Sequence, residues 1–88
     1  MPRYRDVWLE ISKKDRASYP TQVQQQLDQR VAELLEDPRG GASFFPGPQR
    51  DFWITSFGLN HEGTIEYSVR EEPIPTVGIR RVYYMGDL

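Results

Sequence analysis

The chain contains 88 residues, and its 11 basic and 13 acidic side chains give a formal net charge of −2. This balance does not favour nucleic-acid binding through overall charge, so any contact with phosphate must depend on a local cluster of basic residues. The sequence has no cysteine, which excludes disulfides, thiolate catalysis and cysteine-ligated metal sites. A chain of this length is expected to fold as a single domain over residues 1–88.

The N-terminal residues contain no apolar run of signal-peptide length, and no segment reaches the roughly 18 apolar residues of a membrane span. We therefore expect a cytoplasmic location. The sequence contains no glycine-rich phosphate loop, nucleophile elbow or metal-binding motif, so we expect no cofactor and no metal. His61 falls in a predicted turn without neighbouring ligands, and we assign it neither a catalytic nor a metal-binding role.

Residues 4–12 alternate between apolar and polar side chains, which predicts a half-buried strand. Val7, Leu9 and Ile11 would then face the core. Ser12 is expected to begin a short helix, because serine caps helix N-termini and Asp15 follows three residues later.

Pro20 predicts the first turn of a second helix, where the missing N–H of proline would have no partner in any case. Residues 36–41 are expected to end this helix, because Asp37 precedes a proline and two glycines follow. The apolar residues between these signals recur at helical spacing and predict one buried stripe, formed by Val23, Leu27, Val31, Leu34 and Leu35.

The remainder of the chain is predicted to form strands. A loop over residues 42–50 comes first, with Phe44 and Phe45 packing it onto the core. The resulting fold is α+β: an N-terminal strand, two helices on one face of the sheet, and a three-stranded antiparallel meander. We expect the first strand to lie beside the last, which gives a four-stranded, mainly antiparallel sheet. The meander strands are expected at residues 51–58, 64–71 and 76–85.

The last two of these strands form a predicted hairpin that carries the candidate site. A four-residue turn would place Ile79 opposite Val69 and Arg80 opposite Ser68. The buried face would then hold Ile65, Tyr67, Val69, Val77 and Ile79. The open face would hold Glu66, Ser68, Arg70, Arg80 and Tyr84, with Val82 among them.

An open face of this composition has the groups needed to cleave RNA through the 2′-hydroxyl. Glu66 is the candidate general base. Arg70 and Arg80 could hold the phosphate through bidentate hydrogen bonds. Tyr84 could stack on a base or donate a proton to the leaving oxygen. In the competing interpretation Glu66 and Arg80 form an ordinary cross-strand ion pair.

Several segments of the chain resemble the RelE/ParE superfamily of toxins from type II toxin–antitoxin systems. The similar segments are an N-terminal strand, the dipeptide "YP" before a long helix, the helix end "LLEDPRG" and the strand "IEYSV". The resemblance covers about residues 4–84 and implies a toxin-like protein with a cognate antitoxin as partner. It also implies an mRNA endoribonuclease acting at the ribosome, with a gyrase-directed toxin or a non-catalytic protein-binding module of the same fold as alternatives.

The sequence departs from the pattern of this superfamily at the positions that carry its chemistry. Thr64 and Ser68 stand where the superfamily has arginines, and Glu66 stands where an apolar residue is usual. The tail "RRVYYMGDL" has no histidine. The superfamily's catalytic residues therefore do not carry over to Thr64 and Ser68.

Exposed aromatic and apolar residues on so small a chain predict association with a partner. The partner could be a second copy of the chain, giving a homodimer, or an antitoxin helix laid across the sheet or the helices. Trp8 and Trp53 are expected to serve packing or partner contact rather than RNA stacking.

Overall fold

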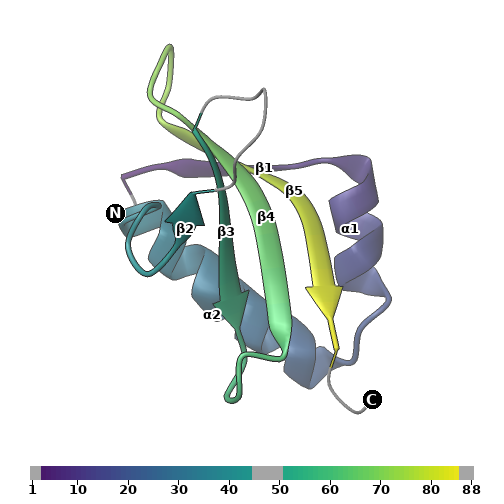
Figure 1. The fold of residues 1–88 in the computed structure, drawn as a ribbon. Helices are drawn as coiled ribbons and strands as arrows, with labels where there is room; N and C mark the ends of the chain where they lie inside the picture. The colour runs from purple at the N-terminus through teal and green to yellow at the C-terminus, as the bar shows by residue number, and fades with distance from the viewer. Residues whose placement is uncertain (1–2, 45–50, 86–88) are drawn as a thin grey trace.

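The computed structural model describes residues 3–44 and 51–85 (Figure 1). The predicted packing of Phe45 lies outside these residues. Two helices and five strands are present in the described ranges. In chain order they are β1 (Arg5–Trp8), α1 (Glu10–Ala17), α2 (Thr21–Glu36), β2 (Ser43–Phe44), β3 (Phe52–Phe57), β4 (Gly63–Arg70) and β5 (Thr76–Tyr84).

The strands form one sheet in the order β1-β5-β4-β3-β2. The sheet is antiparallel except at β1, which pairs in parallel with β5. This arrangement confirms the α+β class and the position of the first strand beside the last. The sheet has one strand more than predicted, because Ser43 and Phe44 pair with Ile54 and Trp53 inside the segment expected to be a loop.

The N-terminal segment differs from the prediction. Val7, Leu9 and Ile11 were expected in the core, but their side chains are 44%, 44% and 46% exposed. The strand ends at Trp8, and α1 already begins at Glu10, so the strand alternation does not extend to Ile11. Trp8 packs against the core instead of Val7.

Ser12 also has a different role from the one predicted. Leu9, not Ser12, is the N-cap residue of α1, and Ser12 is buried within the helix. Its hydroxyl oxygen lies 2.8 Å from the carbonyl oxygen of Leu9 and 2.9 Å from that of Ile79. A buried hydroxyl is stable only with a hydrogen-bond partner. The contact of Ser12 with Ile79 therefore links α1 to β5.

The core lies between α2 and the sheet, and α2 crosses behind the strands (Figure 1). The predicted helical stripe is confirmed for Val23, Leu27, Val31 and Leu34, while Leu35 is only partly buried. The sheet residues predicted to face the helix are all buried: Ile65, Tyr67, Val69, Val77 and Ile79.

Leu27→Ala is expected to lower the free energy of unfolding by roughly 2–5 kcal/mol, because Leu27 is fully buried and the truncation leaves a cavity. This is a large share of the stability of a small domain. Chemical denaturation of both proteins measures the difference. Gln25→Ala, on the exposed side of α2, is the matched control and should leave the midpoint nearly unchanged. Equal midpoints for Leu27→Ala and the parent would contradict the packing.

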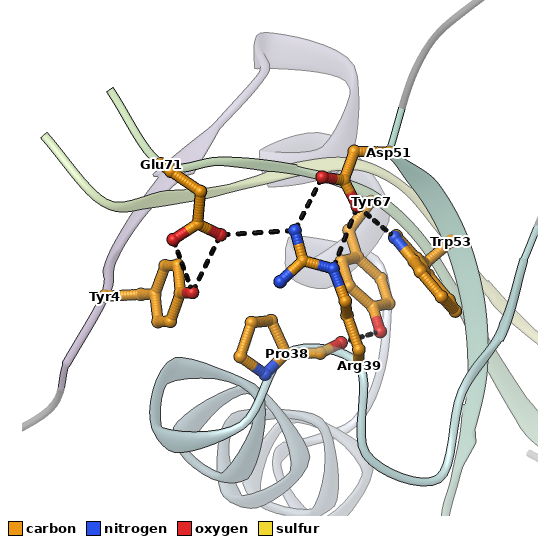
Figure 2. A network of polar contacts seen from close by, with 7 residues as sticks. All are labelled: Tyr4, Pro38, Arg39, Asp51, Trp53, Tyr67 and Glu71. Carbon is orange, nitrogen blue, oxygen red and sulfur yellow. Dashed lines mark hydrogen bonds and ion pairs between the residues drawn. The ribbon is translucent and has the colours of Figure 1, made fainter. Parts of the chain in front are cut away.

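A polar network joins the ends of four elements at one end of the sheet (Figure 2). Arg39, which follows α2, donates from Nε and one Nη to the two carboxylate oxygens of Asp51 at 3.0 and 2.5 Å. The same Nη lies 3.2 Å from Glu71, which accepts a hydrogen bond from the Tyr4 hydroxyl at 2.8 Å. Trp53 donates its indole N–H to Asp51 at 2.6 Å.

A second contact in the same region ties β4 to the end of α2. The fully buried Tyr67 donates its hydroxyl to the carbonyl oxygen of Pro38 (Figure 2). Burial raises the pKa of Tyr67 to about 12. The hydroxyl therefore stays protonated at neutral pH and remains a donor to Pro38.

The hydrogen bonds from Arg39 hold the pKa of Asp51 below its usual range, and the bond from Trp53 acts in the same direction. The folded-state pKa lies below the unfolded value, so the unfolded chain binds more protons between the two pKa values. The stabilisation from Asp51 is therefore complete above about pH 4 and is lost as the pH falls through the folded-state pKa.

Asp51→Asn should therefore flatten the dependence of the free energy of unfolding on pH below about pH 4. Asp6→Asn is a matched control, because Asp6 accepts the indole N–H of Trp8 at 2.8 Å but forms no ion pair in the described part of the chain. Urea unfolding as a function of pH measures both slopes. A wild-type slope in Asp51→Asn would show that the Arg39–Asp51 contact does not govern acid stability.

Candidate functional site

Helix α2 lies behind the sheet, α1 lies beside β5, and no described helix covers the front of the sheet (Figure 1). We call this uncovered side the open face. Because side chains alternate along a strand, the residues between the core positions point to it. They include Phe52 and Ile54 of β3, Glu66, Ser68 and Arg70 of β4, Thr76, Gly78 and Arg80 of β5, and Arg5 and Val7 of β1.

The pairing of β4 with β5 differs from the predicted register. Val69 lies opposite Val77, and Ser68 lies opposite Gly78. The shift is two residues, so the buried and open faces of the first half of the hairpin are as predicted. A β-bulge between Glu66 and Tyr67 then changes the register, and Arg80 is the extra residue that it leaves without a partner on β4.

The bulge reverses the faces of the last residues of β5. Val82 is fully buried, although it was predicted on the open face. Tyr84 was also predicted there, but its ring packs behind the sheet, with centroids 5.8 Å from Tyr19 and 6.3 Å from Phe57. Its hydroxyl donates to Glu62 at 3.5 Å. Tyr84 is therefore separated by the sheet from Glu66, Arg70 and Arg80, which do share the open face.

Arg80 covers an aromatic ring on the open face. Its guanidinium carbon lies 5.2 Å from the centroid of Phe52, a cation–π distance. Phe52 is only 8% exposed, although it does not belong to the main core cluster. The arginine thus shields an apolar side chain on the uncovered side of the sheet and keeps its charge at the surface. The sequence pattern did not indicate Phe52 as part of the site.

Glu66 does not form the ion pair with Arg80 that the competing interpretation required. Its partner in register is Arg81, and the Arg81 side chain is held by Asp15 of α1, with Nε 2.9 Å from the carboxylate. This hydrogen bond raises the pKa of Arg81 above its ordinary value. Within residues 3–44 and 51–85, Glu66 takes part in no ion pair, although its charge also contributes to the raised pKa of Arg81.

Arg70 lines a hollow of about 300 Å³ on the open face. Arg5, which sequence analysis did not select, lines the same hollow from β1. The floor is open at Gly78, where an added Cβ would lie 2.9 Å from the hydroxyl oxygen of Ser68. Neither arginine forms an ion pair with a described residue. Side chains alternate along β1, so Arg5 and Val7 share one face and Asp6 and Trp8 share the other. Sequence analysis would have selected Arg5 only if it had assigned Trp8, rather than Val7, to the core side.

The two tryptophans and His61, which the sequence analysis also considered, form contacts within the fold. Both tryptophan indoles donate to an aspartate two residues earlier and pack beside the core, as the packing interpretation predicted. His61 lies in the β3–β4 turn at φ 59°, with Nδ1 2.7 Å from the hydroxyl oxygen of Ser56. Among the described residues no cluster of His, Asp or Glu is arranged to bind a metal. Neither described helix has the length and hydropathy of a membrane span.

The open face thus combines the Glu66 carboxylate with the guanidinium groups of Arg5, Arg70 and Arg80, which form no ion pair with a described residue. Glu66 can accept a proton, and Arg70 and Arg80 can donate hydrogen bonds to an anion such as phosphate. Tyr84 cannot donate a proton there, because it lies behind the sheet. This set of groups can bind an anionic polymer and supply a base, but it lacks the predicted acid.

No protein-family model matches the chain, and a search of curated proteins finds no match. Solved structures do match. A chain of the toxin–antitoxin complex RelBE2 of Mycobacterium tuberculosis is 16% identical, with a TM-score of 0.79 over 96% of this chain and 99% of that chain. The isolated RelE toxin of E. coli is 21% identical, with a TM-score of 0.78 over 97% of this chain and 87% of that chain.

An archaeal RelE–RelB complex from Pyrococcus horikoshii contains a similar chain, 17% identical with a TM-score of 0.73 over 98% of this chain and 99% of that chain. At these identities the likeness concerns the fold. The chain has the RelE-like toxin fold, in a sequence that diverges widely from those structures.

Proposed function

We propose that this chain is the toxin-like component of a type II toxin–antitoxin pair and that it cleaves mRNA at the ribosome, with the open face as its RNA site. The observation that carries the proposal is the set of open-face arginines that form no ion pair within residues 3–44 and 51–85 of a RelE-like fold. Such cations bind the phosphate backbone of RNA without requiring a basic protein overall. A cytoplasmic location accords with this function.

The partner in this proposal is a cognate antitoxin protein. Four of the similar structures are complexes of RelE proteins with RelB antitoxins or an antitoxin peptide, one from M. tuberculosis, two from E. coli and one from P. horikoshii. A likeness over nearly the whole chain supports the same kind of partner for this protein.

The proposed reaction uses the groups of the open face in turn. Glu66 takes the proton of the 2′-hydroxyl, whose oxygen attacks the adjacent phosphorus and forms a cyclic phosphate. Arg70 and Arg80 hold the phosphate oxygens, where negative charge increases in the transition state. The bond to the 5′-oxygen breaks, and that oxygen takes a proton from water, because Tyr84 lies behind the sheet.

One observation favours a non-catalytic protein-binding module of the same fold as the second candidate. Tyr84 faces the helices, and Arg81 is engaged by Asp15, so two groups of the last strand are unavailable for catalysis. In this alternative the arginines of the open face bind an acidic protein surface, and the chain has no effect on RNA.

The decisive experiment compares growth inhibition and RNA cleavage in the wild type, Arg80→Ala and Glu66→Gln. Each substitution should reduce cleavage by about 10²-fold or more, because each removes one group that acts in the transition state. Stability should change by less than about 1 kcal/mol, since neither side chain is in the core. Arg16→Ala is the matched control, because Arg16 pairs with Asp28 on the helix side and its loss should leave cleavage unchanged.

A wild-type protein that neither arrests growth nor cleaves RNA would refute the ribonuclease and leave the binding module. Full activity in both open-face variants would place the reaction elsewhere. Growth arrest with intact RNA and damaged DNA would indicate a gyrase-directed toxin.

A further inference from the structure

Glu66 has two diagonal neighbours on the adjacent strand of the open face. On β3, Ile54 lies directly opposite Glu66, so the diagonal positions belong to Phe52 and Ser56. Such neighbours lie roughly 7–8 Å apart on one face of a sheet. Phe52 carries the guanidinium of Arg80 above its ring. Ser56 therefore occupies the side of Glu66 that lies away from this arginine.

Ser56 brings His61 to this corner of the sheet. Thr55 and Phe57 are buried on the core side, so the side chain of Ser56 between them points to the open face. Its hydroxyl oxygen lies 2.7 Å from Nδ1 of His61. β2 pairs with β3 only as far as Ile54, so no described strand flanks β3 at this point. The imidazole, which is exposed, is therefore accessible to a bound RNA.

The contact with Ser56 decides which ring nitrogen of His61 can give up a proton. Nδ1 is engaged by Ser56, whereas Nε2 forms no hydrogen bond with a described residue. In a protonated ring, the Nδ1–H group donates to the serine oxygen and the Nε2–H group is left to donate elsewhere. After Nε2 loses its proton, the same Nδ1–H bond holds the neutral ring in place. The arrangement suits proton donation from Nε2.

The backbone of His61 gives a second observation. Its φ of 59° lies in the left-handed region, which glycine adopts without strain and few other residues adopt. A side chain at this position is thus present at an energetic cost. Backbone strain of this kind is concentrated at functional sites.

The charged groups around His61 are bound to other partners. His61 lines a hollow of about 470 Å³ between α2 and the outer end of β3. The charged side chains of α2 in this hollow, Arg30 and Glu33, form an ion pair with each other at 3.0 Å. Glu62, the next residue in the chain, accepts the backbone N–H of Asn60 at 3.0 Å. In the described ranges no carboxylate pairs with the imidazole.

We propose that His61 is the general acid of the ribonuclease reaction and takes the place of water in protonating the leaving 5′-oxygen. This inference rests on the proposed function. Glu66 takes the proton of the 2′-hydroxyl, and the 2′-oxygen bonds to phosphorus. The bond from phosphorus to the 5′-oxygen breaks, and that oxygen takes the proton from Nε2 of His61. The products are a 2′,3′-cyclic phosphate and a 5′-hydroxyl, and exchange with solvent restores both side chains.

Tyr83 is a second open-face residue with an acidic proton. It points to the open face, because Tyr84 beside it packs behind the sheet. The guanidinium carbon of Arg81 lies 5.1 Å from the centroid of its ring. An imidazolium is a much stronger acid than a phenol and donates a proton more readily near neutral pH. The chemistry therefore favours His61 over Tyr83.

The test replaces the leaving oxygen with sulfur, because a thiolate leaves without needing a proton. Wild-type protein and a short model mRNA bound to the ribosome first identify the cleaved position. The same mRNA is then made with a 5′-bridging sulfur at that position. Single-turnover rates are measured on both substrates for wild type, His61→Asn, Ser56→Ala and Tyr83→Phe. Asparagine tolerates a positive φ, so His61→Asn preserves the turn. Thermal unfolding midpoints verify that each variant is folded.

His61→Asn should cleave the oxygen substrate about 10²-fold or more slowly than wild type, because general acid catalysis contributes at least this factor. On the sulfur substrate it should cleave as fast as wild type, within about threefold. Ser56→Ala should lose about tenfold on the oxygen substrate and nothing on the sulfur substrate, because it only misplaces the imidazole. Tyr83→Phe is the matched control and should resemble wild type on both.

Four results would overturn the inference. An equal loss on both substrates in His61→Asn would assign His61 a structural role. Full activity of His61→Asn on the oxygen substrate would leave water as the proton donor. A loss on the oxygen substrate alone in Tyr83→Phe, with His61→Asn unimpaired, would assign the acid to Tyr83. A wild type that cleaves neither substrate would refute the ribonuclease itself, which the first three results would leave intact.

Discussion

The spacing of three apolar residues on the last strand determines much of this structure. Val77, Ile79 and Val82 are all fully buried, but a regular strand can direct only residues an even number apart to the same face. The interval from Ile79 to Val82 is odd, so β5 must contain an extra residue. The β-bulge opposite Glu66 and Tyr67 provides it. Arg80 is thereby directed to the open face, and Tyr84 is directed toward the helices.

The segment that lies beside β5 also changes at the bulge. β1 pairs with β5 as far as Ile79, where the bulge begins. β1 ends there at Trp8 and is followed by α1. From there Asp15 of α1 takes the place of a strand: its carboxylate accepts the backbone N–H of Val82 at 2.9 Å and also binds Arg81. An edge donor that would otherwise be exposed is satisfied by a side chain. The buried hydroxyl of Ser12 supports this junction from the preceding turn of the helix.

The spacing of apolar residues predicted those elements in which burial of one face alone decides the pattern. The stripe of α2 and the alternation of β4 follow from burial on one face, and both are confirmed. The register of the last hairpin was wrong, because turn length and bulge position depend on packing across the sheet rather than on local pattern. Leu9 and Ile11 were misplaced because an apolar alternation continued past the true end of β1. The open face was predicted correctly for Glu66, Arg70 and Arg80, although the strand position of Arg80 was not. The position of Tyr84 depends on the bulge, and that of Arg5 depends on which side of β1 faces the core.

The parallel pairing of the first strand with the last has a consequence for the newly made chain. Ser12 forms a contact with Ile79, which lies 67 positions later in the sequence. Ribosomes add about 5–20 residues each second, so the N-terminal segment waits roughly 3–13 s before its neighbour exists. During that time β5 is absent, so β1 has no strand to pair with and α1 lacks its contacts with β5. A chain stalled before β5 is made therefore retains an unpaired β1 and a Trp8 side chain without part of its core packing, which a chaperone or protease can recognise.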